Sequence, residues 1–240
     1  MEEMDQVVEE AAYDRIAYEY YDDVHKTSRN FDEATKAALK VAELVVPDGL
    51  VLEPGSGRGR CGEFLGLEPS RLVHLDNSTR MLALTPREDS LLRILHDAEH
   101  LPFSDADFSC VAAFLCDPFL GLNFLAEARR VLRPGGILLG TTPSDQWGLA
   151  LRKSLGIDPM MTRFVLRTGE TIRVPSALFS VDELREMLSV AGFDPSGIAI
   201  SAHPLPEGIE PVSPDIESSA TSMGASVYAL DIINLFIAQG

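Results

Sequence analysis

Apolar residues recur along this chain with two spacings that alternate. Residues 11–46 place them at helical intervals, as at Ala34, Ala38, Val41 and Val45. Five short, almost continuously apolar runs follow at 50–53, 71–75, 91–95, 108–115 and 136–142, and helical spacing returns near 60–66, 78–84 and 121–132. Short buried strands that alternate with helices predict an α/β fold, in which helices cover both faces of a mostly parallel sheet.

The last third of the chain has a different pattern. Residues 164–174 alternate around Thr168-Gly169, which predicts a hairpin. A helix is predicted after Ser180, with Glu183 completing a capping box and Gly192 ending the helix. Two further strands are expected at 196–202 and 231–238, and the segment 205–225 between them, rich in Pro, Ser and acidic residues, is predicted to be a surface loop.

Length and composition indicate one globular domain. The chain has 240 residues, 45% of them hydrophobic, which is enough for a sizeable core. Within this domain, 1–240, we expect an N-terminal helical lid at 1–46, a core formed by 47–204 and 226–240, and the loop at 205–225.

Charge, apolar runs and cysteine content indicate which partners and which cellular location to expect. A net charge of −17 repels phosphate backbones, so we expect no nucleic-acid partner. The chain lacks an apolar run of the ~18 residues that a membrane span needs, so we expect no membrane partner. The acidic residues 1–10 lack the features of a signal peptide and the three cysteines form no CxxC pair, so we expect a cytoplasmic protein. The pattern leaves the oligomeric state open.

A glycine-rich stretch follows the first predicted strand, with the sequence Glu53-Pro54-Gly55-Ser56-Gly57-Arg58-Gly59. Glycines at a strand-to-helix turn let backbone N–H groups approach a ligand closely. Two registers fit: acidic-x-Gly-x-Gly-x-Gly from Glu53, which suggests S-adenosylmethionine, and Gly-x-Gly-x-x-Gly from Gly57 through Gly62, which suggests a dinucleotide. Only the first register gives Glu53 a role, as the acid that faces a methionine ammonium. A turn that binds no ligand is the remaining alternative.

Two acidic residues follow the second and third predicted strands. Asp76 is positioned to accept hydrogen bonds from both ribose hydroxyls of a nucleoside, or to cap the next helix. Asp97 is positioned to accept from an adenine amino group, and the backbone N–H of Ala98 to reach a ring nitrogen. Asp76 suits either nucleotide ligand, whereas Asp97 and Ala98 favour S-adenosylmethionine.

With the later segment Leu132-Arg133-Pro134-Gly135-Gly136, these stretches form four motifs in a fixed order. Over about residues 10–200 the chain resembles the class I S-adenosylmethionine-dependent methyltransferases, and especially their small-molecule branch. The resemblance implies a Rossmann-like sheet of seven strands with the last strand antiparallel, an N-terminal helical lid, and S-adenosylmethionine as cofactor. The family often has a small residue where this chain has Arg58. The cofactor-binding residues that the resemblance implies are Tyr13, Tyr21, Glu53, Gly55, Ser56, Gly57, Gly59, Asp76, Asn77, Met81, Asp97 and Ala98.

The acceptor end is less clearly marked. Members of this branch often have a histidine after the fourth strand, where this chain has Asp117. Asp117 is one candidate base, and its alternative roles are to cap the helix at 121–132 or to contact the methionine end of the cofactor. His25, at the end of the aromatic N-terminal helix, is the other candidate base, with a surface role as its alternative. Trp147, Met160, Met161 and Phe164 are candidates for an apolar acceptor pocket, or for ordinary packing.

Metal binding is not expected. His96 and His100 have the i,i+4 spacing of helical metal ligands, but they flank a loop close to Pro102. The tyrosines of the N-terminal segment suggest an aromatic lid, and their alternative is an amphipathic helix packed on the sheet.

These observations predict an enzyme that transfers a methyl group from S-adenosylmethionine to a small-molecule acceptor, with transfer to oxygen or nitrogen favoured over carbon. Two alternatives belong to other classes. One is a protein with the same fold that binds the cofactor without methyl transfer, in a regulatory or cyclisation role. The other is a nicotinamide-dependent oxidoreductase that uses the second glycine register.

Overall fold

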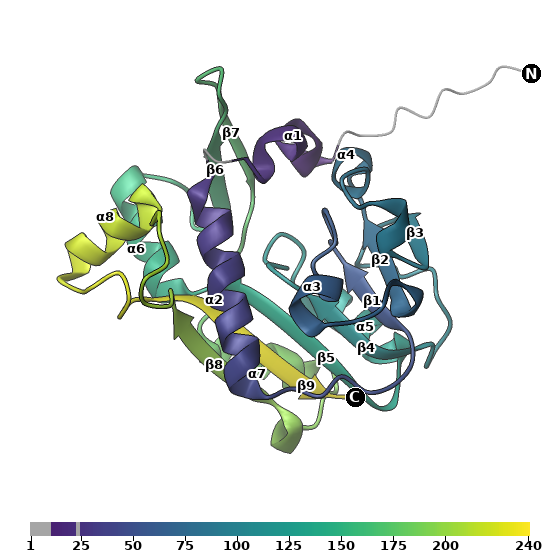
Figure 1. The fold of residues 1–240 in the computed structure, drawn as a ribbon. Helices are drawn as coiled ribbons and strands as arrows, with labels where there is room; N and C mark the ends of the chain where they lie inside the picture. The colour runs from purple at the N-terminus through teal and green to yellow at the C-terminus, as the bar shows by residue number, and fades with distance from the viewer. Residues whose placement is uncertain (1–10, 23–24) are drawn as a thin grey trace, which may run out of the picture.

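A seven-stranded sheet forms the centre of the molecule (Figure 1), in a computed structural model that describes residues 11–22 and 25–240. The strand order is β3-β2-β1-β4-β5-β9-β8, and β1 to β5 run parallel. β9 is antiparallel to both of its neighbours, β5 and β8, as expected. The strands are β1 (Val51–Pro54), β2 (Leu72–Asp76), β3 (Leu92–Leu95), β4 (Phe108–Ala113), β5 (Leu132–Pro143), β8 (Ala199–Pro204) and β9 (Asp231–Gln239).

Burial explains the strand pattern, with one exception. All residues of β1, β2 and β4 are buried, which is why these strands are apolar almost throughout. The run at 91–95 was predicted to be a buried strand, and in this respect the prediction is wrong. β3 lies at the sheet edge, and Leu92 and Leu95 are each about half exposed (48% and 49%). An apolar run does not distinguish an edge strand from a central one.

Helices cover both faces of the sheet. One apolar core lies against α5 and α7, and the other against α2, α3, α6 and α8, whereas α4 contacts β2 and β3 near the edge. In α2, Ala34 and Ala38 lie one turn apart and are fully buried, so the helix packs closely on the sheet. The helices are α2 (Lys26–Ala42), α3 (Cys61–Leu65), α4 (Thr79–Leu82), α5 (Leu122–Val131), α6 (Asp145–Leu155), α7 (Val181–Val190) and α8 (Pro214–Met223).

Two short segments lie above the carboxyl ends of the strands (Figure 1). The first contains a 3-10 turn, Ala12–Arg15, and the four-residue helix α1, Ala17–Tyr20, where the sequence predicts one aromatic helix. The second is the hairpin of β6 (Met161–Val165) and β7 (Thr171–Pro175), which confirms the expected hairpin. We call residues 12–22 and 161–175 together the roof.

Polar contacts join the two parts of the roof. Tyr13 donates from its hydroxyl to Pro175 O at 3.1 Å, and Arg15 Nη2 pairs with Glu170 Oε1 at 2.6 Å. The backbone N–H of Arg167 donates to Glu19 Oε2 at 2.8 Å. Beneath these contacts, an apolar cluster brings both segments together through Ile16, Ala17, Ile172 and Val174, with Met81 of α4.

The segment 205–225 differs from its prediction. It is not a loop throughout, because α8 occupies Pro214–Met223. Ser213 caps the helix by accepting from the N–H of Asp215, and Gly224 follows the helix with a positive φ. At α7, by contrast, the capping box of Ser180 and Glu183 is confirmed.

Candidate functional site

A cleft of about 420 Å³ opens between the sheet, the roof and α2. The carboxyl ends of β1, β2 and β4 meet here, as parallel strands require. Thirteen of the fourteen site residues predicted from the sequence line the cleft, and the exception is Gly59. Those that line it are Tyr13, Tyr21, His25, Glu53, Gly55, Ser56, Gly57, Asp76, Asn77, Met81, Asp97, Ala98 and Asp117.

The glycine loop has a backbone that side chains would not permit. Gly55, Gly57 and Gly59 have φ values of +62°, +52° and +77°. A Cβ on Gly55 would overlap the ring of Phe119, and one on Gly57 would lie 2.5 Å from the hydroxyl of Tyr21. Gly59 does not line the cleft; a Cβ at this position would lie 2.8 Å from Cε1 of the buried His74 ring, so its absence leaves room for that ring. The loop therefore presents backbone to the cleft at Gly55 and Gly57.

Asp76 holds this loop against β2. Its Oδ2 accepts from Gly57 N at 2.8 Å, and its Oδ1 accepts from Ser78 N at 2.8 Å. Burial raises the pKa of Asp76. The alternative role as a helix cap belongs instead to Ser78, whose side chain accepts from Met81 N. A carboxylate has about four acceptor positions, so Asp76 can still accept from a ligand in the cleft.

Glu53 lies beneath the loop in a buried polar contact. Its Oε1 accepts from the backbone N–H groups of Arg60 (2.8 Å) and Cys61 (3.2 Å). His74, its neighbour in the β1–β2 register, places Nε2 3.2 Å from Glu53 Oε2, although the angles do not form a hydrogen bond. Burial raises the pKa of Glu53 to about 7 and lowers the pKa of His74 to about 4. His74 is therefore a neutral partner at neutral pH.

Arg58 stands where the sequence resemblance led us to expect a small residue, and its side chain contacts an aromatic ring. Its guanidinium carbon lies 4.4 Å from the centroid of the Tyr21 ring, and that of Arg60 lies 4.9 Å from the same ring. Arg60 also pairs with Asp32 of α2. The two arginines thus join the loop to Tyr21 of the roof and to α2.

The third predicted stretch also lines the cleft, through Asp97 and Ala98. Asp97 Oδ1 accepts from Glu99 N at 2.9 Å, and the buried Ala98 follows it. The ring of His100 lies 3.3 Å from Asp97 Oδ2, so this histidine contacts a carboxylate. Within residues 11–22 and 25–240, no three His, Cys, Asp or Glu side chains are grouped as a metal site would require.

Asp117 and His25, the two candidate bases, line the same cleft. Asp117 is 7% exposed, and burial raises its pKa to about 7, against the opposing effects of Ser176 and Arg152. It does not cap α5, which begins after Gly121 without a side-chain cap. His25 precedes α2 rather than ending an aromatic helix, its ring lies edge-on to Phe164 at 5.4 Å, and burial lowers its pKa.

The apolar residues proposed for the acceptor end divide into two groups. Trp147 and Phe164 line the cleft, whereas Met160 and Met161 do not, and Met160 is 58% exposed. Met160 precedes β6 and Met161 begins it, whereas the cleft is lined by the later residues of this strand, 162–165. Two polar residues of the wall, Arg152 and Ser176, carried no sequence signal, because neither belongs to a motif.

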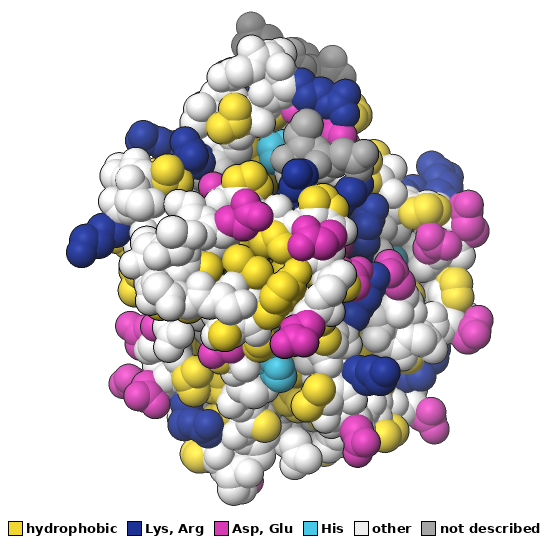
Figure 2. All heavy atoms as spheres, turned by 60° about the vertical axis from the view of Figure 1, so that its left-hand side comes forward, with side chains coloured by type: hydrophobic (Ala, Val, Ile, Leu, Met, Phe, Trp, Pro, Cys, Tyr) yellow, Lys and Arg dark blue, Asp and Glu magenta, His cyan; other side chains and the backbone are white. Residues whose placement is uncertain are grey.

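One face of the molecule carries charges of both signs. On the face in Figure 2, acidic and basic side chains are interspersed, and hydrophobic side chains gather near the centre. Among the described helices, none combines the length and apolar character that crossing a membrane requires.

Comparison with known proteins agrees with this geometry. Residues 52–140, which contain the glycine loop, Asp76, Asp97 and Asp117, match the family described as "Methyltransferase domain". Phthiotriol/phenolphthiotriol dimycocerosates methyltransferase 1 of Mycobacterium ulcerans is 39% identical over 106 residues, which are 40% of this chain and 39% of that protein. The uncharacterized methyltransferase YodH of Bacillus subtilis is 34% identical over 112 residues, which are 44% of this chain and 48% of that protein. The chain thus spans less than half the length of these curated relatives.

A solved structure extends the likeness to the whole fold. The S-adenosylmethionine-dependent methyltransferase of Thermotoga maritima, described as a possible histamine N-methyltransferase, superimposes with a TM-score of 0.62 at 17% identity, covering 95% of this chain and 98% of that one. An identity this low supports the fold alone. The chain therefore has a Rossmann-like methyltransferase fold, and its residues 52–140, which contain the glycine loop and the two following acids, match the methyltransferase domain family.

Proposed function

We propose that this protein transfers a methyl group from S-adenosylmethionine to an oxygen or nitrogen atom of a small-molecule acceptor. One observation carries the proposal: a single cleft is lined both by the glycine loop, Asp76 and Asp97, which suit a nucleoside, and by the buried carboxyl group of Asp117. The Mycobacterium ulcerans relative is named for dimycocerosate substrates, which supports a small-molecule acceptor over a macromolecule.

The residues of the cleft fit S-adenosylmethionine. The loop at Gly55 and Gly57 has no Cβ to block a ligand, and Ser56 Oγ is buried with no hydrogen-bond partner among the described residues. Asp76 is the residue for the ribose hydroxyls, Asp97 and Ala98 for adenine, and Glu53 for the methionine ammonium. Tyr13, Tyr21, Asn77 and Met81 complete the wall. The cofactor supplies a methyl group activated by its positive sulfur.

The chain contributes alignment and exclusion of water. A displacement at carbon needs the nucleophile in line with the leaving group, so the principal task is to hold the acceptor in place. The roof lies over the cleft and contributes the rings of Tyr13, Tyr21 and Phe164 to it. Such a cover shields the reacting atoms from water.

Titration calorimetry with S-adenosylhomocysteine tests the cofactor assignment, and mass spectrometry of acceptor mixtures tests transfer. We expect saturable binding, and products heavier by one methyl group together with released S-adenosylhomocysteine. Binding without any methylated product across oxygen, nitrogen and carbon acceptors would favour a regulatory or cyclisation role. Thermal stabilisation by NAD or NADP but not by S-adenosylhomocysteine would contradict the proposal altogether.

A further inference from the structure

Three buried polar side chains meet at the acceptor end of the cleft, and we call them the polar cluster: Asp117, Arg152 and Ser176. They are 7%, 5% and 3% exposed, and all three line the cleft. Asp117 follows β4, Arg152 lies on α6, and Ser176 follows β7. The fold therefore brings together three segments that are separate in the sequence.

Arg152 donates the hydrogen bonds that hold the polar cluster together. Arg152 Nη2 donates to Ser176 Oγ at 2.8 Å, and its Nη1 donates to Pro159 O. The backbone N–H of Ala177, the residue after Ser176, donates to the backbone carbonyl of Asp117 at 3.1 Å, so Ser176 lies beside Asp117, and its hydroxyl lowers the pKa of the Asp117 carboxyl group. Because an ionised carboxylate can only accept, the Ser176 hydroxyl accepts from Arg152 and directs its own proton toward ionised Asp117. The serine thus fixes the orientation of the carboxyl group.

When Asp117 is ionised, as a base must be, the polar cluster carries no net charge. Asp117 and Arg152 bear opposite charges and act on each other's pKa. The other titratable groups that interact with them are Tyr13 and Tyr20 of the roof, Cys116 and Asp158. A charged acceptor placed beside this balanced pair would be buried without a partner of its own, which is unfavourable. The polar cluster therefore suits a neutral acceptor.

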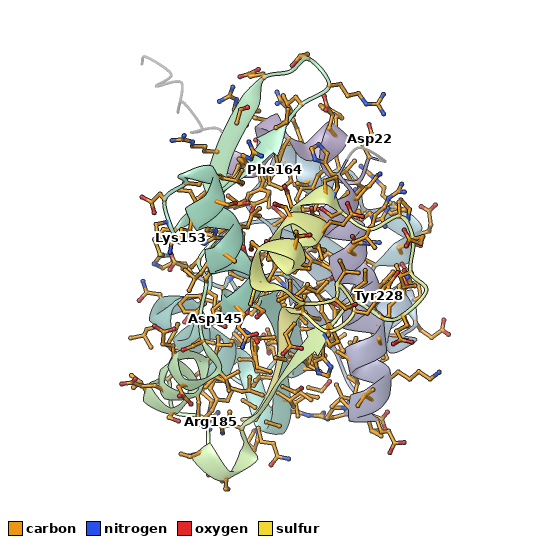
Figure 3. All side chains as sticks on the ribbon, turned by 90° about the vertical axis from the view of Figure 1, so that its left-hand side faces the viewer. Asp22, Asp145, Lys153, Phe164, Arg185 and Tyr228 are labelled. Carbon is orange, nitrogen blue, oxygen red and sulfur yellow. The ribbon has the colours of Figure 1, made fainter. Side chains whose placement is uncertain are left out.

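Aromatic rings form the wall on the roof side. The ring centroid of Phe164 lies 5.4 Å from those of Tyr20 and His25 and 6.5 Å from that of Tyr13, and all four residues line the cleft. Figure 3 shows Phe164 on the hairpin where it meets the N-terminal segment. Offset and edge-on contacts between rings are favourable, so this wall suits an aromatic acceptor.

Building on the proposed function, we propose that the acceptor is a neutral aromatic molecule with a hydroxyl group, that Asp117 removes the hydroxyl proton, and that Ser176 and Arg152 are positioning residues for Asp117. In this step the acceptor oxygen forms a bond to the methyl carbon, and the electron pair of the broken carbon–sulfur bond returns to sulfur. The hydroxyl proton moves to the Asp117 carboxylate and from there to water. Asp117 alone contacts the reacting hydroxyl.

The first test is binding of three matched probes to the protein saturated with S-adenosylhomocysteine. The probes are 2-naphthol, 2-naphthoate and 2-naphthylmethylammonium, which share a ring system and differ in charge. We expect 2-naphthol to bind about tenfold more tightly than either charged probe. Tighter binding of a charged probe, or no binding of 2-naphthol, would overturn the assignment. A failure to bind S-adenosylhomocysteine itself would instead contradict the proposed function.

The second test is the pH profile of 2-naphthol methylation. Burial raises the pKa of Asp117 to about 7, whereas Ser176 and Arg152 each lower it. A base must be ionised, so wild-type turnover should rise with pH through about 7. Ser176→Ala and Arg152→Gln should move this rise to higher pH, because each removes a group that lowers the pKa of Asp117, and Ser176→Thr should restore it. Asp117→Asn should lower kcat about 10²-fold or more and abolish the rise.

Ser154→Ala is the matched control, because Ser154 also lies on α6 but donates only to Leu151 O. Its profile should match the wild type. An unshifted profile for folded Ser176→Ala and Arg152→Gln variants would show that these residues only stabilise the fold. Full activity of Asp117→Asn, or binding of 2-naphthol without turnover, would show that Asp117 is not the base. If aromatic amines were methylated and phenols were not, the hydroxyl assignment would fail while the proposed function stood.

Discussion

Replacing Glu53 with glutamine should change how the stability of the protein depends on pH. Glu53 is 2% exposed, and burial raises its pKa from an ordinary value near 4.5 to about 7. A carboxyl group whose pKa is higher in the folded state favours folding when protonated, and this contribution is lost as the pH rises from 4.5 through 7. The difference of 2.5 pKa units corresponds to ~3 kcal/mol at 1.36 kcal/mol per unit.

Glutamine keeps the local contacts and removes the titration. Its carbonyl oxygen can accept from the N–H groups of Arg60 and Cys61, as Glu53 Oε1 does. We therefore expect Glu53→Gln to gain stability over the wild type as the pH rises, up to ~3 kcal/mol above about pH 8. Urea unfolding without ligand, at several values between about pH 5 and pH 9, measures this difference.

The control removes one acid elsewhere. Glu68 is exposed, so a plot of the free energy of unfolding against pH for Glu68→Gln should run parallel to that of the wild type between about pH 5 and pH 9. If Glu53→Gln also ran parallel to the wild type, the ionisation of Glu53 would not be coupled to folding, and the reasoning from burial would be refuted. A variant that is less stable at every pH would show instead that the carboxylate is required beneath the loop.

Three further predictions concern the roof and the residues proposed to bind the cofactor. Asp76→Ala should weaken S-adenosylhomocysteine binding by about 2–3 kcal/mol, because it removes charge-assisted hydrogen bonds, and wild-type affinity in calorimetry would exclude the ribose assignment. Gly57→Val should abolish this binding while circular dichroism remains native, because φ is +52° and the new Cβ would meet the Tyr21 hydroxyl; normal binding would show that the loop does not hold the cofactor. Hydrogen exchange in residues 12–22 should slow when S-adenosylhomocysteine is added, and deletion of residues 1–24 should weaken cofactor retention and abolish transfer; unchanged exchange, or full activity after the deletion, would show that the segment only packs.

The placing of the glycine loop, Asp76 and Asp97 around the cleft could be predicted from the sequence, because the requirements for it are local. A strand that ends in an acid, followed by glycines at alternate positions, specifies the backbone of the loop whatever surrounds it. Asp76 ends β2 and Asp97 follows β3, and parallel strands bring their carboxyl ends to one edge of the sheet. The arrangement of these residues around one cleft thus follows from strand order alone.

The acceptor end could not be predicted in the same way. Ser176 and Arg152 reach Asp117 through the packing of the hairpin and α6, and their sequence neighbourhoods contain no periodic signal for that contact. The helix α8 was missed for another reason. Its composition is that of a loop, but Ser213 followed by Pro214 is a helix-start signal that could have been recognised.

The roof is assembled from segments about 150 residues apart, and this sets a condition for engineering the acceptor pocket. A hairpin transplanted from a different protein of this fold would lack residues matched to Arg15 and Glu19 of the N-terminal segment. The Tyr13 hydroxyl would also lose its acceptor, the backbone carbonyl of Pro175. The two segments of the roof should therefore be exchanged together. Chimeras that swap both pieces together should retain a cover over the cleft, whereas recombination between them in natural sequences would separate residues that depend on each other.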